Sequence, residues 1–145
     1  MVIINKMFAT FDRTYFPIVK VTFNGSPQSD DDFEQFLNQW LQLYEEKEEF
    51  MFYFDTINVS NPEIKYGLKM SQFIKKLKKQ ELQYLQKSFI IINNDMVKWI
   101  LEFIFLIQPP VATVYIYHVS NGLLNDFNDN VEMICGHTET ILIEP

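Results

Sequence analysis

The sequence is poor in the residues that build most recognisable catalytic sites. It contains one cysteine, two histidines and four glycines. No Gly-rich phosphate-binding loop, dinucleotide fingerprint or nucleophile elbow is present. Cys135 and His137 are two positions apart, but no second ligand pair accompanies them, which argues against structural zinc, and a Cys–His nucleophile would lack a third member. We therefore expect no enzymatic activity, no cofactor and no metal site.

The chain also lacks the features of a secreted or membrane-spanning protein. A lone cysteine cannot form an intramolecular disulfide, which favours the cytoplasm or another reducing intracellular compartment. Residues Met1–Phe8 show none of the three regions of a signal peptide. The longest apolar run, Trp99–Ile107, is interrupted by Glu102 and is shorter than the ~20 residues that a spanning helix needs. We expect no transmembrane segment.

Basic residues are in deficit. Acidic residues number 19 against 12 basic ones, for a net charge of −7. This balance argues against binding to nucleic acid or to an anionic membrane as the main task. What the chain does have is length and apolar content: 145 residues, 48% hydrophobic and 16% aromatic. These values predict one domain with a well-filled core that needs no disulfide or metal.

Hydrophobic patterning predicts alternating strands and helices. The strand-like segments are Met7–Phe11, Ile18–Phe23, Phe50–Phe54, Phe89–Ile92 and Val111–Tyr117. Helical spacing follows the Ser29 cap through Phe33–Tyr44, then follows Pro62, with Ser60 or Asn61 as the cap, and then covers Met96–Ile107 after Asn94. A short helix is predicted from Ser120 through Phe127, and the tail Val131–Ile143 is predicted to form one or two short strands.

This order predicts an α/β fold. Residues 1–145 should form a single domain with a mixed, mainly parallel sheet of four to five strands and three to four crossover helices, comprising a core (1–128) and a tail (129–145). If strands are added in one direction, right-handed connections place all the helices on one face. The central strands are apolar on both faces, so the tail and a second chain are expected to cover the other face together.

The stretch from Pro17 to about Phe127 resembles the STAS-like superfamily, which is named for sulfate transporters and anti-sigma-factor antagonists, and within it the divergent stand-alone members. The likeness rests on the strand Ile18–Phe23, the acidic helix start Asp30–Phe33, the strand ending in Asp55 and the apolar helix that runs into Gln108–Pro110. The resemblance implies a non-enzymatic domain that binds proteins or small ligands. Regulatory members accept phosphate on a serine after the Asp-ended strand. Here the Asp-Ser-Ser-Gly run of those members is absent, and Ser60 is the serine near that place.

Polar residues follow three predicted strands. They form a candidate binding or regulatory site, since sites in parallel sheets lie outside the carboxyl ends of the strands. Its members are Asp55, Ser60, Asn61, Asn93, Asn94 and His118. The alternative is that these residues are caps and turn formers, which every strand-to-helix junction needs.

Lysines recur along one side of the second predicted helix, at Lys65, Lys69, Lys76 and Lys79. They form a candidate docking surface for an acidic protein or a phosphate-rich ligand, and the alternative is an ordinary solvated face. The third predicted helix is apolar nearly all round, so one side can face the sheet and the other a partner, a neighbouring helix or a lipid.

Two functions remain open. The favoured one is a protein-interaction or assembly module of STAS-like type, working with a protein partner or as a homo-oligomer. The alternative is a carrier of small apolar ligands or lipids that resembles CRAL-TRIO domains. An internal apolar cavity above about 300 Å³ would favour the carrier. A filled core with an exposed apolar patch would favour the interaction module.

Overall fold

The computed structural model describes residues 7–145. Among them, six strands form one sheet in the order β1-β2-β3-β4-β5-β6. They are β1 (Ala9–Asp12), β2 (Ile18–Phe23), β3 (Phe50–Asp55), β4 (Leu85–Ile92), β5 (Thr113–His118) and β6 (Ile141–Ile143). The strands β2 to β5 are mutually parallel, and β1 and β6 pair antiparallel at the two edges. The expectation that Met1–Phe8 forms no signal peptide concerns mainly residues 1–6, which lie outside the described residues.

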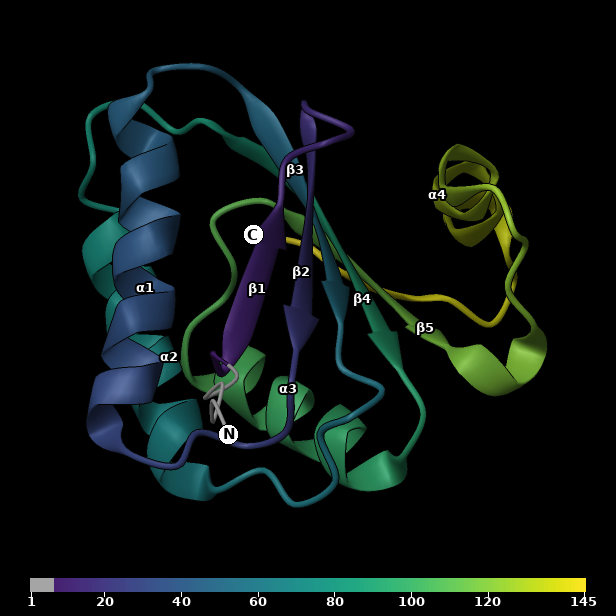
Figure 1. Ribbon diagram of the computed structural model, residues 1–145, viewed down its shortest axis with the longest axis horizontal. Helices are drawn as coiled ribbons and strands as arrows, with labels where there is room; N and C mark the ends of the chain where they lie inside the picture. Colours follow the sequence, from purple (N-terminus) through teal and green to yellow (C-terminus); the bar gives the residue numbers. More distant parts are fainter. Residues whose placement is uncertain (1–6) are drawn as a thin grey trace, which may run out of the picture.

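Four α-helices accompany the sheet. They are α1 (Asp30–Glu45), α2 (Ile64–Leu77), α3 (Asp95–Ile107) and α4 (Phe127–Gly136), and a 3₁₀ turn, η1, covers Val119–Asn121. Figure 1 shows α1, α2 and α3 on one side of the sheet and α4 on the other. Because consecutive strands are neighbours, connections of a single hand place the first three helices on the same face.

The main core lies between the sheet and α1–α3. Alternate strand residues point into it, including Val19 and Val21 of β2 and Phe52 of β3, all fully buried. Phe33, Phe36 and Trp40 supply the stripe of α1 that meets them. Ser29 caps α1 as expected: its hydroxyl accepts a hydrogen bond from the Asp32 amide at 3.2 Å.

A second, smaller core lies on the opposite face of the sheet. It joins Tyr53, Phe89 and Tyr117 of the central strands to Ile134 of α4. The bare sheet face expected from the sequence is therefore not present, because α4 lies on it and buries these side chains. The prediction that a second chain covers part of this face loses its premise. The prediction that the tail covers part of it is correct, although the covering element is a helix.

Three other expectations need correction. The sheet has six strands rather than four to five, because the last three-residue segment pairs with β5. The expected helix Ser120–Phe127 is replaced by the turn η1 and a following loop. Residues 131–136, part of the segment expected as strand, belong to α4, which has Asp126 as its cap. The helix α2 begins at Ile64 with Glu63 as its N-cap residue, so neither Ser60 nor Asn61 caps it.

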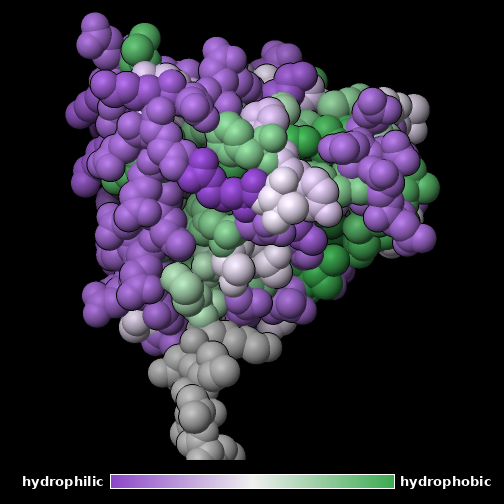
Figure 2. Space-filling view, turned by 45° about the horizontal axis from the view of Figure 1, so that its top comes forward, coloured by the Kyte–Doolittle hydropathy of each residue, from purple (hydrophilic) through white to green (hydrophobic). Residues whose placement is uncertain are grey.

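Figure 2 shows how side chains of different kind are distributed over the outside of this fold. Hydrophilic residues cover the side of the molecule on which α1 lies, at the left of the view. Hydrophobic residues reach the surface toward the right, where the second face of the sheet meets α4. Leu124 and Leu142, both half exposed, belong to the segments around α4. On the face seen in Figure 2, hydrophilic residues are thus concentrated over the α1 side.

Candidate functional site

The carboxyl ends of the parallel strands bring together only part of the predicted polar site. Asp55 ends β3, Asn93 and Asn94 follow β4, and His118 ends β5. Asp55 accepts a hydrogen bond from the Ile57 amide at 3.0 Å, and His118 Nδ1 accepts one from the Ser120 amide at 3.2 Å. Both side chains thus serve local turns, as polar residues commonly do after strands.

Asn94 is the best-connected member of this group. Its side-chain oxygen accepts a hydrogen bond from the Val97 amide at 2.9 Å and so caps α3. Its side-chain amide donates to the Val59 carbonyl at 2.9 Å and to the Asn93 side chain at 3.3 Å. Asn94 therefore ties the loop after β4 to the loop after β3, which is a structural task.

Ser60 and Asn61 lie in the loop that leads to α2. Ser60 is exposed and stands four positions before Ile64, the first residue of the helix. A phosphate on Ser60 would therefore not lie at the helix start, where free N–H groups and the helix dipole stabilise negative charge. Asn61 contributes its backbone carbonyl, which accepts a hydrogen bond from the Ser26 hydroxyl at 3.3 Å.

A polar cleft of about 240 Å³ lies beyond the ends of β4 and β5. His118, Asp95, Lys98 and Glu139 supply its charged and titratable side chains. Ser120, Asn121 and three isoleucines complete the wall. His118 lines this cleft, whereas Asp55 and Asn94 do not. The predicted site is therefore divided between two locations.

The predicted docking lysines on and just after α2 differ in their ionic contacts. The ammonium of Lys65 lies 3.1 Å from one carboxylate oxygen of Asp30, and that of Lys69 lies 3.5 Å from the other. The hydrogen bond between Lys65 and Asp30 raises the pKa of the ammonium and lowers the pKa of the carboxyl. Lys76 is exposed in the last turn of α2, and Lys79 is exposed just after it. The free positive charge therefore gathers at the carboxyl end of α2.

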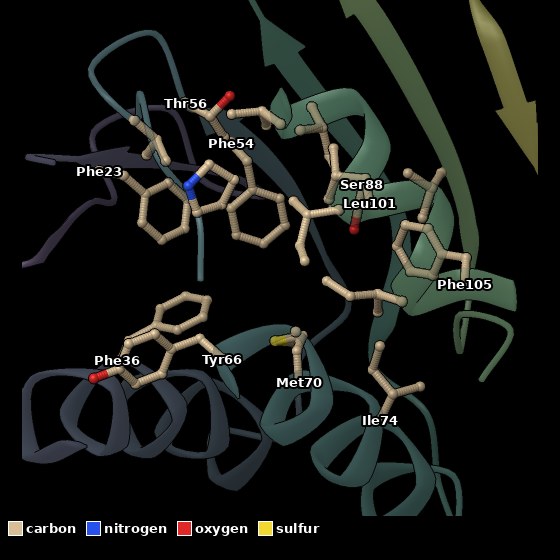
Figure 3. Close-up of a pocket in the computed structure, with 18 of the residues that line it drawn as sticks. Phe23, Phe36, Phe54, Thr56, Tyr66, Met70, Ile74, Ser88, Leu101 and Phe105 are labelled. Atoms are coloured by element: carbon tan, nitrogen blue, oxygen red, sulfur yellow. The ribbon is translucent and has the colours of Figure 1, made fainter. Parts of the chain in front are cut away.

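An apolar cavity of about 180 Å³ lies between the helices and the sheet. Figure 3 shows that β3, α2 and α3 contribute side chains from different directions, among them Phe54, Met70 and Leu101. The volume is below the 300 Å³ expected of a lipid or drug-sized ligand site. It is nevertheless large for the interior of a domain, where voids bigger than a water molecule are few.

Two polar side chains that the sequence did not single out line this cavity. Figure 3 shows the Ser88 hydroxyl of β4 pointing into it. Trp40 also lines it, and within residues 7–145 its buried indole N–H has no hydrogen-bond partner. The sequence carried one signal for Ser88: it is the polar member of the inward-facing series Ser88, Ile90 and Ile92. Nothing in the sequence distinguished Trp40 from the rest of its apolar stripe.

The outer side of α3 carries exposed apolar side chains. Successive residues turn by about 100° around a helix, so Met96, Trp99, Phe103, Leu106 and Ile107 lie on one side of it. We call these five residues the α3 stripe. Leu106 is 85% exposed, and the rings of Trp99 and Phe103 stack at 5.6 Å. Val97, Ile100 and Ile104 of this helix are buried, so one side of α3 faces inward while the α3 stripe faces outward.

The second face of the sheet holds two tyrosines with shifted acidity. Burial, assisted by the nearby Asp55 charge, raises the pKa of Tyr53 to about 12. Burial also raises the pKa of Tyr117, whose hydroxyl donates to the Gly122 carbonyl at 2.5 Å. Tyr53 packs against Phe127 of α4 with ring centroids 4.5 Å apart. These groups hold α4 in place and lie in the small core, away from both pockets.

The described part of the chain has neither a metal-ligand cluster nor a membrane-spanning helix. Across residues 7–145, no three side chains of His, Cys, Asp or Glu stand close enough together to hold a metal ion. None of the helices in the same range has the length and apolar character needed to cross a bilayer.

Comparisons with known proteins return one similarity of fold. No protein-family model matches the sequence, and no curated protein matches it. Among solved structures, the chain is similar to an uncharacterized protein of the DUF3478 family with a SpoIIAA-like fold from Shewanella loihica PV-4. The two are 13% identical with a TM-score of 0.49, and the match covers 88% of this chain and 92% of that one. This likeness concerns the fold alone.

Proposed function

We propose that this protein is a non-catalytic interaction module that docks an amphipathic helix of another protein on the outer side of α3. The observation that carries the proposal is the α3 stripe. Leu106 is 85% exposed near its carboxyl end, and Met96, Trp99 and Ile107 are about half exposed. A contiguous apolar surface of this kind on a domain marks an interaction site more often than a scatter of single residues does.

The chemistry of the stripe suits a docked helix. Trp99 and Phe103 present stacked rings with an interplanar angle of 11°, and Leu106 stands one turn beyond them. Large aromatic side chains of this type supply much of the energy in protein interfaces. A helix that lays an apolar face along such a surface is a common mode of recognition.

The charge around the stripe favours an acidic partner. The helix α2 packs against α3 with Gly67 beside Ile100 and with the Ser71 hydroxyl 3.4 Å from the Ile104 carbonyl, so the two helices run in the same direction. The last turn of α2, with Lys75 and Lys76 and then Lys78 and Lys79 after it, therefore lies toward the Leu106 end of α3. A second copy of this chain would bring the same lysines to the same place, where like charges oppose each other. A partner helix with acidic residues beside its apolar face would meet both surfaces favourably.

Photo-crosslinking inside the cells that naturally make the protein tests this proposal. A photoreactive residue at position 106 is expected to give an adduct with one discrete partner. The crosslinked peptide of that partner should carry acidic residues beside an apolar helical face. Placing the same residue at position 124 is the matched control, because Leu124 is 51% exposed but belongs to the segment before α4, on the other face of the sheet from α3 (Figure 1).

Charge reversal supplies the second measurement. Lys76→Glu with Lys79→Glu should weaken the isolated complex, and raised salt should weaken the unchanged complex, because exposed charges are screened beyond about 10 Å at 0.1 M salt. An adduct of two copies of this chain at position 106 would replace the acidic partner by self-association. Equal labelling at positions 124 and 106 would contradict the proposal altogether.

A further inference from the structure

We infer that the apolar cavity beneath α3 is a binding site for one small, uncharged aromatic molecule. The inference is independent of the proposed docking surface, because the cavity lies on the inner side of the same helix. Its volume of about 180 Å³ exceeds the roughly 150 Å³ of an engineered apolar protein cavity that stays dry and binds benzene. A molecule built on a single ring therefore matches the space.

The walls fit an aromatic ligand. Phe23, Phe36 and Phe54 line one half of the cavity, and Met70, Ile74 and Leu101 line the other half (Figure 3). Aromatic pairs attract each other in edge-to-face or offset arrangements. The thioether of Met70 adds a polarizable group that pairs well with rings. This combination distinguishes the cavity from a purely aliphatic one.

The polar groups of the wall limit the chemistry further. The Ser88 hydroxyl points into the space, and the buried indole N–H of Trp40 is unpaired within residues 7–145. The third candidate, the Thr56 hydroxyl, already donates to the Ile91 carbonyl at 2.7 Å. The ligand can therefore carry one hydrogen-bonding substituent, such as a phenolic hydroxyl.

Charged ligands do not fit this site. Among residues 7–145, Glu63 supplies the sole carboxylate of the lining and is exposed, and Tyr66 directs its hydroxyl to Asp30 at 3.2 Å. Within the same residues, no lysine or arginine belongs to the lining. A buried charge without a partner is strongly unfavourable, so carboxylates and ammonium compounds should be rejected.

We infer that the ligand enters the cavity between two loops. Ser26 and Pro27 before α1, and Pro62 and Glu63 before α2, line the outer end of the cavity and are exposed or partly exposed. The Ser26 hydroxyl donates to the Asn61 carbonyl at 3.3 Å and joins the two loops. Separation of these loops would open the space without disturbing the sheet.

Titration of the full chain with p-cresol, followed by methyl and amide NMR shifts, tests the site. We expect saturable shifts at Met70, Ile74 and Leu101, and a melting temperature that rises with ligand concentration. Toluene should bind to the same residues, and p-toluate should not. Shifts confined to Trp99 and Leu106 would show surface binding and overturn the inference. Tighter binding of a long fatty acid to the cavity would overturn the ligand class.

Two matched variants locate the binding. Leu101→Phe places a ring in the cavity and should weaken p-cresol binding at least tenfold, whereas Leu106→Phe on the exposed side of the same helix should leave it unchanged. Ser88→Ala should weaken p-cresol binding and leave toluene binding unchanged. Equal p-cresol affinity in the Leu101 and Leu106 variants would refute the site. If Leu101→Phe does not fold, the residues whose NMR signals shift in the unmodified protein still show where p-cresol binds.

Discussion

Single polar side chains at the strand ends of this protein mainly shape the backbone. Asn94 is the clearest case, because it caps α3 and also bonds the neighbouring loop through Val59. Ser29 caps α1 through a single bond at 3.2 Å from the Asp32 amide to its hydroxyl. The two residues therefore form a natural comparison between a cap that acts alone and a cap that also joins two loops.

Asn94→Ala is expected to lower the free energy of unfolding more than Ser29→Ala. Loss of an N-cap costs about 1 kcal/mol. Asn94→Ala also leaves the part-buried Val59 carbonyl without its side-chain donor, which adds on the order of 1 kcal/mol. Urea unfolding of both variants measures the difference. Equal losses would mean that the bond to Val59 contributes nothing, and Asn94 would then be free to serve a ligand.

At the scale of elements, much of the fold follows from the sequence pattern. The parallel strands, the first three helices and the caps at Ser29 and Asn94 were predictable because periodicity and capping residues are local signals. The tail was predictable only in part. Val131–Ile143 was expected to form one or two short strands, and Ile141–Ile143 does form β6 at the open edge of β5, but Asp126 caps a helix that takes up residues 127–136. Such tertiary effects override local propensity.

The candidate site was predictable only in part for the same reason. Asp55, Asn94 and His118 were found because strand ends are visible in the sequence. The cavity was not found, because its walls are the same apolar residues that a filled core would use. A void depends on whether helices and strands meet closely, and spacing along the chain does not report that distance.

The contact between α2 and α3 gives a test of this packing. Gly67 is buried in α2, and a methyl group added there would lie 3.0 Å from Cδ1 of Ile100. Ile100 also lines the cavity, so its side chain has space into which it can shift. Since Ala favours a helix over Gly by about 1 kcal/mol, we expect Gly67→Ala to be neutral or stabilising by up to that amount.

Differential scanning calorimetry of the Gly67 variants measures this effect. Gly67→Val adds branching that the shift of Ile100 cannot accommodate, and it should destabilise the domain. A marked loss of stability in Gly67→Ala would show that Ile100 is held rigidly and that the cavity does not yield on this side.

At the scale of the whole molecule, the chain covers its sheet unequally. Three helices lie on one face and a single ten-residue helix lies on the other. That single helix shields Tyr53, Phe89 and Tyr117, which are almost completely buried. The integrity of the second face thus depends on how firmly α4 is held, and Ile134, fully buried, is its main anchor.

Ile134→Asp is expected to release α4 from the sheet and to cause new self-association through the exposed face. Burying an unpaired carboxylate is costly, so the helix should leave the sheet and expose an apolar face larger than a soluble domain normally tolerates. Sedimentation velocity should show larger species, and dye binding to exposed apolar surface should rise. Cys135→Asp is the matched control, because Cys135 is exposed on the same helix and should leave both readouts unchanged. Unaltered sedimentation of the Ile134 variant, with its secondary structure intact, would show that the sheet face does not need α4 to stay apart from other copies.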